Sequence, residues 1–234
     1  MIGLGVTGTD TEVGKTFVST LLLGLLRRQG LRVAAMKPVE TGVKANDPGS
    51  DAMRLRQAAG MDAAIEDVRP VLLAEPLSPW VALSRAGGAI DVAALDAAFH
   101  RITDGVDAVV VEGAGGLLVP LTRDLAYDGL FVSWGLDLVV VAGNRRGTIN
   151  HTQLTVRAAH DAGLRVRGVV LNALDPDPGG IAERTNREAL AELLDPVPVI
   201  PLPWLRRDRG PEYALDIAEE NGFGRLVAAR TPPA

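Results

Sequence analysis

The sequence predicts an α/β fold in which a doubly wound, mostly parallel sheet carries helices on both faces. Short runs rich in Val, Leu and Ile recur along the 234 residues without polar alternation, as in strands that are buried on both faces. Between these runs lie longer stretches with apolar residues at helical spacing. Strands and helices that alternate in this way predict parallel strands joined by right-handed helical crossovers.

The apolar runs and the periodic stretches give the positions of the elements. Strands are expected at residues 2–7, 32–36, 108–111, 138–141, 166–171 and 197–200. Helices are expected at residues 15–29, 50–59, 92–103, 150–162, 181–194 and 213–221. Residues 69–88 contain three prolines and no helical period, so we expect a long ordered loop there.

Length and composition are those of one globular domain over residues 1–234, with residues 231–234 as a frayed tail. Hydrophobic residues make up 47% and charged residues 23%, and no repeat or low-complexity tract divides the chain. The net charge is −5 and the arginines are scattered, which argues against nucleic acid as the main partner. The absence of cysteine excludes disulfides, thiol nucleophiles and cysteine metal sites, so any bound metal would take oxygen ligands.

Targeting and membrane-spanning segments are not expected from this sequence. The N-terminus has no basic segment followed by an apolar signal core, and no apolar run reaches the ~18 residues that span a bilayer. We therefore expect a cytoplasmic protein that does not bind membranes.

Residues 8–16 form a glycine-bracketed segment that ends in Gly-Lys-Thr, between an apolar run and a predicted helix. In such a segment, backbone N–H groups and the helix N-terminus bind phosphate, Lys15 neutralises the outer phosphates, and the Thr16 hydroxyl is a ligand for Mg²⁺. Five residues separate Gly8 from Gly14, where the common phosphate-loop pattern has four. A plain strand-to-helix turn is the alternative interpretation. The context favours a P-loop NTPase-like fold that binds ATP or GTP.

Charged residues lie after two further strands and at one helix start, near the sheet edge where ligands bind in such folds. Glu112 ends an apolar strand and suits an acid near nucleotide-bound Mg²⁺, although a surface acid would look the same. Lys37 closes another strand, where its charge can stabilise a transferring phosphoryl group; a solvated lysine is the alternative. Asp51 is either a second carboxylate near Mg²⁺ or a plain helix-start residue beside Ser50.

Six motifs occur in the same order as in one enzyme family. They lie at residues 7–16, 37–42, 75–79, 111–116, 147–151 and 203–205, and the longer phosphate loop is among them. With these motifs the chain resembles dethiobiotin synthetases, the ATP-dependent carboxylases of biotin biosynthesis, over residues 1–205. Thr41 stands where many members of that family have serine, and either hydroxyl can hydrogen-bond the substrate.

The resemblance implies a ligase that converts 7,8-diaminononanoate (7,8-diaminopelargonate), CO₂ and ATP into dethiobiotin, ADP and phosphate. In that family the N7 amine is carbamylated, a carbamate oxygen attacks the γ-phosphate, and the N8 amine closes the ring from the carbamic-phosphoric anhydride. The resemblance also implies Mg²⁺ as a cofactor and a homodimer, in which residues 147–150 accept the substrate carboxylate across the interface.

The same resemblance assigns roles to individual residues. Lys37 and Lys15 would be catalytic. The nucleotide and its metal would contact Glu12, Val13, Gly14, Lys15, Thr16, Phe17, Asp51, Glu112, Gly113, Ala114, Gly115, Asn172, Pro203, Trp204 and Leu205. The diamine would contact Thr11, Thr41, Pro79, Gly147 and Asn150, and Mg²⁺ would be held by Thr16, Asp51 and Glu112. For the segment after Gly147, helix capping by Thr148 or Asn150 is the alternative.

Two other functions stay open at this point. A partitioning-type nucleotide-switch ATPase shares the fold, but its phosphate loop carries an additional early lysine where this chain has residues 9–12. A cobyrinate-type amide-forming synthetase normally brings a glutaminase domain with a nucleophilic cysteine, and this chain has no cysteine. Residues 206–209 match no motif and receive no role.

Overall fold

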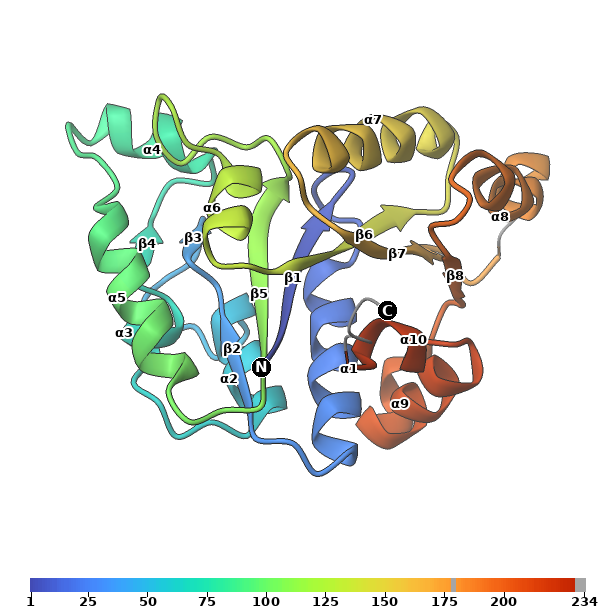
Figure 1. Cartoon of the computed structure of the whole chain (residues 1–234), viewed down its shortest axis with the longest axis horizontal. Helices are drawn as coiled ribbons and strands as arrows, with labels where there is room; N and C mark the ends of the chain where they lie inside the picture. Colours follow the sequence, from blue (N-terminus) through green and yellow to red (C-terminus); the bar gives the residue numbers. More distant parts are fainter. Residues whose placement is uncertain (178–179, 230–234) are drawn as a thin grey trace, which may run out of the picture.

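The computed structural model describes residues 1–177 and 180–229, and it has three layers: a central sheet between two layers of helices (Figure 1). The frayed tail expected at residues 231–234 lies outside the described residues. The central sheet has six strands in the order β2-β5-β1-β6-β7-β8, and every neighbouring pair is parallel. The predicted fold class is therefore confirmed.

The strands of this sheet occupy the expected positions with shifted ends. Their bounds are β1 Ile2–Gly8, β2 Val33–Met36, β5 Ala108–Gly116, β6 Asp137–Gly143, β7 Val166–Asn172 and β8 Val199–Leu202. The largest difference is β5, which continues to Gly116 although the strand was expected to end at Val111. Gly116 still pairs with Gly8 of β1, so backbone pairing extends the strand beyond its apolar run.

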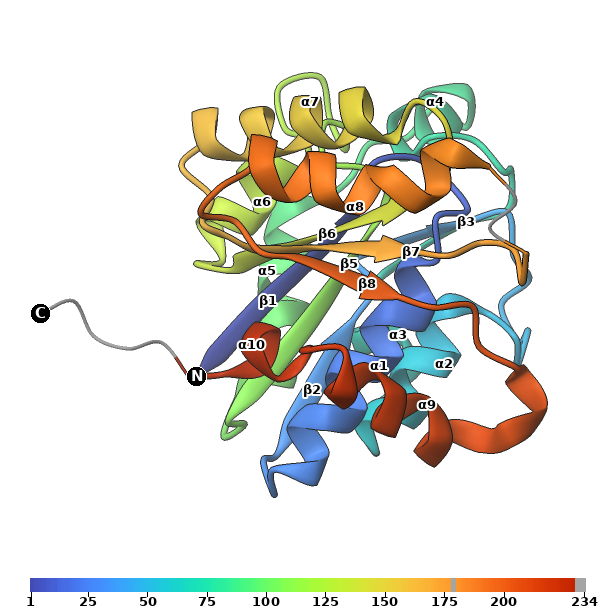
Figure 2. The same cartoon turned by 90° about the vertical axis from the view of Figure 1, so that its right-hand side faces the viewer.

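Helices cover both faces of the sheet (Figure 2). One face carries α1 Lys15–Arg28, α2 Asp51–Ala59, α9 Gly210–Glu220 and α10 Gly224–Val227. The other carries α5 Val92–Thr103, α6 Tyr127–Ser133, α7 Thr148–Asp161 and α8 Ile181–Leu193. Of these, α6 and α10 were not expected, because seven and four residues are too few to show a helical period.

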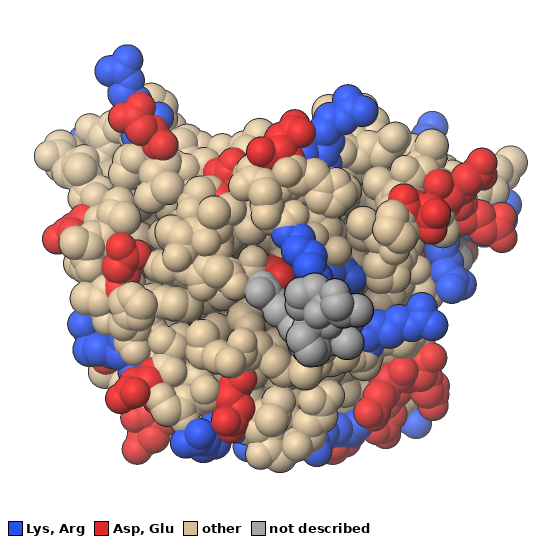
Figure 3. Space-filling model, viewed as in Figure 1, with Lys and Arg blue, Asp and Glu red and all other residues tan. Residues whose placement is uncertain are grey.

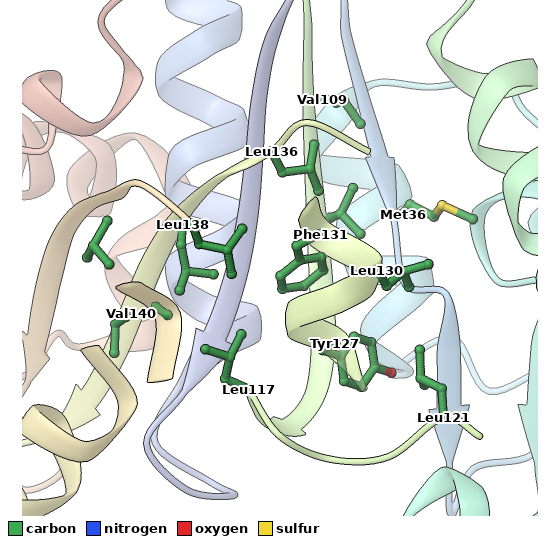
Figure 4. Packing of buried hydrophobic residues seen from close by; sticks show 14 of the residues in the cluster. Met36, Val109, Leu117, Leu121, Tyr127, Leu130, Phe131, Leu136, Leu138 and Val140 are labelled. Carbon is green, nitrogen blue, oxygen red and sulfur yellow. The ribbon is translucent and has the colours of Figure 1, made fainter. Parts of the chain in front are cut away.

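Strand β5 shows how the apolar runs produce the two-sided core. Val109 and Val111 pack with Phe131 in the cluster under α5 to α8, while Ala108 and Val110 belong to the cluster under α1. Figure 4 shows the first of these clusters around Phe131 and Val109. Burying an apolar side chain of this size contributes about 1.5–3 kcal/mol, so the sheet centre is a rigid base for the loops at its carboxyl edge.

The prediction of a long loop at residues 69–88 is wrong, because the structure has β4 Val71–Leu73 and α4 Pro79–Arg85 there. β4 pairs in parallel with β3 Val39–Thr41 as a separate two-stranded sheet. Strands of three residues are too short to give a sequence pattern. Pro79 is the first residue of α4, a position where proline is compatible with a helix.

Two short features complete the described chain. A single helical turn, α3, spans Ile65–Val68, and the 3₁₀ turn η1 spans Arg207–Arg209. In the described residues, no helix is both long enough and apolar enough to cross a membrane.

Candidate active site

The phosphate loop runs from the end of β1 to the start of α1, and its backbone is tightly constrained. Gly14 has φ +94°, and a Cβ atom on it would lie 2.3 Å from Nδ2 of Asn172. Glu12 also has a positive φ of 57°. The Asn172 amide donates a hydrogen bond of 2.9 Å to the Val13 carbonyl, so the end of β7 supports the loop. Glycine at position 14 is therefore required by both conformation and space.

Lys15 folds back over this loop. Its Nζ donates a hydrogen bond of 3.2 Å to the Asp10 carbonyl and lies 3.1 Å from the position that a Cβ on Gly8 would take. Burial and, secondly, the neighbouring Lys37 ammonium lower the pKa of Lys15 to about 8. A bound anion at this point would relieve both effects, which is the electrostatic property expected of a phosphate site.

Lys37 lies directly after β2 and is the centre of a buried charge cluster. Its Nζ donates to Oδ2 of Asp51 at 2.9 Å, to Oε1 of Glu112 at 2.5 Å and to the Gly113 carbonyl at 3.4 Å. Burial alone would lower the pKa of Lys37, but the Glu112 and Asp51 carboxylates outweigh burial and raise it above its ordinary value. Lys37 is therefore an ammonium ion that is only 3% exposed, and the solvated-lysine alternative is wrong.

Glu112 is fully buried in β5 and connects this cluster to the phosphate loop. The Thr16 hydroxyl donates to its Oε1 at 2.9 Å, on the same oxygen that Lys37 contacts. Oε2 of Glu112 has no hydrogen-bond partner among the described residues. The surface-acid alternative is therefore wrong. A buried carboxylate oxygen without a partner normally requires a ligand or water, so the site fits a hard cation.

The oxygen donors at this point are of the kind that Mg²⁺ prefers, but they are few. Thr16, Asp51 and Glu112 would supply a hydroxyl and two carboxylates. Within residues 1–177 and 180–229, no group of three or more His, Asp or Glu side chains is gathered tightly enough to hold a metal. A Mg²⁺ ion would therefore need phosphate and water oxygens as well, as is usual for nucleotide-bound Mg²⁺.

Asp51 combines the two readings that the sequence left open. It is the first residue of α2, whose N-cap is Ser50, and the Ser50 hydroxyl accepts a hydrogen bond of 3.4 Å from the Met53 N–H. The Asp51 carboxylate nevertheless points to Lys37. Although burial opposes it, the Lys37 ammonium holds the pKa of Asp51 below its ordinary value. Asp51 is therefore ionised and belongs to the site.

The other predicted contacts lie around this centre on separate elements. Thr11 is exposed in the phosphate loop, Phe17 is in the first turn of α1, and Gly113, Ala114 and Gly115 are in β5. Thr41 ends β3, and Pro79 begins α4.

Gly147 and Asn150 lie at the start of α7. Gly147 is the N-cap with φ +88°, and no side chain caps this end of the helix. The alternative, that Thr148 or Asn150 caps the helix, is therefore wrong: Thr148 is buried, and its hydroxyl has no hydrogen-bond partner in the described chain. The uncapped N–H groups leave this end of α7 able to bind an anion.

The segment predicted to hold adenine lies beyond β7 and β8. Asn172 pairs with Leu202 in the sheet, and residues 203–205 follow directly after β8. Trp204 is 43% exposed there. The Asn172 amide donates its hydrogen bond to the Val13 carbonyl, so in this structure it supports the phosphate loop.

Sequence reasoning missed two buried residues beside the site, Glu40 and Arg69. They form an ion pair of 2.9 Å, and Glu40 also accepts a hydrogen bond from the Asp51 backbone. Arg69 follows α3 in the stretch that was read as a loop, so its sequence context gave no signal. Glu40 lies inside the motif at residues 37–42, and a carboxylate among buried strand residues was the available signal.

A strand, a glycine loop, a Lys-Thr helix start and an acid at the end of a neighbouring parallel strand define a phosphate-loop nucleotide-binding protein. A family model described as an AAA domain matches residues 3–206. An ATP-dependent dethiobiotin synthetase of Anaeromyxobacter dehalogenans is 42% identical, covering 87% of this chain and 91% of that protein. The Thermodesulfovibrio yellowstonii enzyme of the same name is 38% identical, with coverages of 87% and 89%. This chain belongs to the ATP-dependent dethiobiotin synthetase family.

Solved structures agree on the fold. The cell division ATPase MinD of Pyrococcus furiosus matches with a TM-score of 0.56, covering 94% of this chain and 98% of that one. The two sequences are only 18% identical, so this likeness concerns the fold alone.

Proposed function

We infer that this chain forms dethiobiotin from 7,8-diaminononanoate, CO₂ and ATP, releasing ADP and phosphate. Membership of the synthetase family supports the reaction. The observation that carries it in this molecule is the pair of lysines, Lys15 and Lys37, that reach one edge of the sheet from different strand ends. Lys37 contacts Oε1 of Glu112, and Oε2 of that carboxylate lacks a partner in the described chain.

The reaction requires one anion to attack another. The N7 amine adds to CO₂ and loses a proton, which gives a carbamate; a carbamate oxygen then attacks the γ-phosphorus as the bond to ADP breaks. The N8 amine attacks the carbamoyl carbon, phosphate leaves, and a cyclic urea forms with loss of a second proton. Lys15 and Lys37 neutralise the charge between the two anions and hold them in line, which is the main contribution a protein makes to phosphoryl transfer.

Mg²⁺ would be held by Thr16, Asp51 and Glu112 together with phosphate oxygens. Bound there, it would neutralise phosphate charge in the transition state. Lys37 already occupies Oε1 of Glu112, whereas Oε2 is free of described partners. Glu112 can therefore bind the Lys37 ammonium with Oε1 and a Mg²⁺ ion with Oε2.

The substrate contacts are also part of this proposal. Thr11, Thr41 and Pro79 would line the diamine site. Gly147 and Asn150 of a second copy would bind the substrate carboxylate at the uncapped start of α7. Asn172 and residues 203–205 would hold the adenine.

A homodimer in the cytoplasm is the proposed form of the enzyme. Trp80 and Leu118 are exposed apolar side chains on neighbouring segments, because the Trp80 N–H donates to the Pro120 carbonyl. Such a pair suits contact with a second copy. Nucleic acid is not a proposed partner, since the face in Figure 3 has basic side chains interspersed with acidic ones.

Carbon fixation tests the function directly. The full chain is supplied with diaminononanoate, ¹⁴C-bicarbonate and MgATP, and acid-stable label is measured with and without ATP. We expect label that depends on ATP and on the diamine. A nucleotide-switch ATPase would hydrolyse ATP and fix no carbon, and that result would reject the proposal.

A further inference from the structure

A buried ion pair lies directly beneath the start of α2. The Glu40 side chain comes from β3, Arg69 follows α3, and both side chains are no more than 4% exposed. Oε2 of Glu40 and Nη1 of Arg69 are 2.9 Å apart. Charged side chains this deeply buried are costly unless all their hydrogen-bonding groups are used.

The pair is tied to the helix start by several hydrogen bonds. Oε1 of Glu40 accepts from the Asp51 backbone N–H at 2.5 Å. Arg69 donates through Nη1 to the Ser50 hydroxyl at 3.5 Å and through Nη2 to the Ala45 carbonyl at 2.8 Å. The pair thus holds the N-cap residue, the first helical residue and the loop before them.

Asp51 transmits this constraint to the active site. Its backbone is held by Glu40, and its carboxylate lies 2.9 Å from Lys37 Nζ. Lys37 is held from the same side, because its backbone N–H donates to the Val68 carbonyl next to Arg69. A shift of α2 would therefore move the Asp51 carboxylate relative to Lys37 and Glu112.

Stability alone would be a weak reason for such a pair, because buried ion pairs often stabilise a fold no more than apolar residues do. A second buried ion pair, at the amino ends of the strands, offers a comparison. Asp137, the first residue of β6, pairs with Arg167 at 2.9 Å, and both side chains are at least as buried. Arg167 also donates to the Leu226 carbonyl, so that pair fastens α10 to the sheet far from the nucleotide.

We propose that Glu40 and Arg69 are positioning residues that fix the Asp51 carboxylate for binding of the Mg²⁺ ion that accompanies the nucleotide. This inference rests on the proposed function for its meaning in catalysis. Arranged in this way, the pair acts as the outer support of a metal ligand. Loss of such a support typically lowers metal affinity or activity 10- to 100-fold.

Glu40→Gln is the most informative variant. A carboxylate accepts hydrogen bonds with both oxygens, whereas an amide has one accepting oxygen, so glutamine cannot serve the Asp51 N–H and Arg69 together. Asp137→Asn makes the same chemical change in the control pair. Both variants are full-length chains, and the melting temperature of each is measured first.

Calorimetric titration of Mg²⁺ in the presence of a non-hydrolysable ATP analogue is the direct readout. We expect Glu40→Gln to raise the half-saturating Mg²⁺ concentration about 10-fold, with the Mg²⁺-free affinity for the analogue unchanged. Asp137→Asn should lower the melting temperature but leave the half-saturating Mg²⁺ concentration unchanged. Excess Mg²⁺ should restore turnover in Glu40→Gln, which a purely structural defect would not allow.

Arg69→Lys is measured alongside, because one ammonium cannot reach both Glu40 and the Ala45 carbonyl as the guanidinium fork does. An unchanged Mg²⁺ requirement in a folded Glu40→Gln or Arg69→Lys chain overturns the proposal. An equal shift in Asp137→Asn overturns it too. If the wild-type chain fixes no carbon while Glu40→Gln still weakens Mg²⁺ binding, the proposed function fails and the positioning role stands.

Discussion

Nζ of Lys37 lies 2.5 Å from Oε1 of Glu112, although 75 residues separate them in the sequence. The Thr16 hydroxyl contacts the same carboxylate oxygen. Lys37, Glu112 and the start of α1 are therefore one connected unit. A change in any of these three residues should alter both charge neutralisation and metal binding.

Replacing Lys37 with alanine should reduce dethiobiotin formation at least ~100-fold, the size of effect that follows loss of one preorganised electrostatic group. The reason is that Lys15 alone would then neutralise the charge between the attacking carbamate and the γ-phosphate. Initial rates at saturating ATP and diamine measure the effect.

Lys44→Ala is the control for this variant, because Lys44 is an exposed lysine outside the charge cluster. It should keep wild-type turnover. Full activity in a folded Lys37→Ala chain would remove Lys37 from the mechanism.

Glu112→Gln should weaken Mg²⁺ binding, so that half-maximal activity needs a higher Mg²⁺ concentration, while leaving the fold intact. Glutamine keeps the size of the side chain and one accepting oxygen for Lys37, but it removes the negative charge that favours a divalent cation. A metal titration, compared with circular dichroism, measures both properties. Glu188→Gln, on the exposed face of α8, is the matched control. A metal requirement equal to that of the wild type would contradict the assignment of Glu112.

The parts of this site that the sequence could predict are the local ones. Gly14, Lys15 and Thr16 were identifiable because the loop, its helix and its preceding strand are contiguous in the chain. Lys37 and Glu112 could be assigned to the same sheet edge, because parallel strands end together. Their direct contact, and the carboxylates that keep the buried Lys37 an ammonium ion, depend on how the strands and α2 pack together.

The parts that could not be predicted depend on long-range pairing. Glu40 and Arg69 meet through β3 and β4, which have three residues each and carry no period. Asn172 was expected to contact adenine, but its amide bond to Val13 joins residues 159 positions apart. Such pairings are set by tertiary packing, which a single sequence does not display.

The lowered pKa of Lys15 predicts an unusual pH dependence of stability in the nucleotide-free protein. The pKa is about 8 in the folded chain and returns to 10.5 on unfolding, so the unfolded state binds more protons between these values. The free energy of unfolding should therefore rise as the pH increases above about 8, by up to about 3 kcal/mol from this group. Below pH 8 the cost of the buried charge is fully present.

Urea unfolding at constant ionic strength between pH 7 and 9.5 tests whether the free energy of unfolding rises with pH. The groups facing Lys15 are Lys37, Glu112, Asp51 and Asp10. Burial raises the pKa of Tyr127 to about 12, which lowers stability only above pH 10, so the chosen range avoids it. Lys15→Met should remove the rise. A parallel pH profile in Lys15→Met and wild type would show that Lys15 is not its source.

Asn172→Ala distinguishes loop support from base recognition. If the amide supports the phosphate loop through Val13, its loss should weaken binding of ATP and of inorganic tripolyphosphate alike, by about fivefold for one hydrogen bond. Base recognition alone would weaken only the binding of ATP.

Displacement of a fluorescent nucleotide analogue measures both affinities. Asn221→Ala is the control, because the Asn221 amide bonds to the Ile217 carbonyl of α9. Because the amide lies directly against Gly14, we expect the affinity for tripolyphosphate to fall, and any additional loss for ATP measures the proposed contact with adenine. An unchanged affinity for tripolyphosphate would assign Asn172 to the base instead.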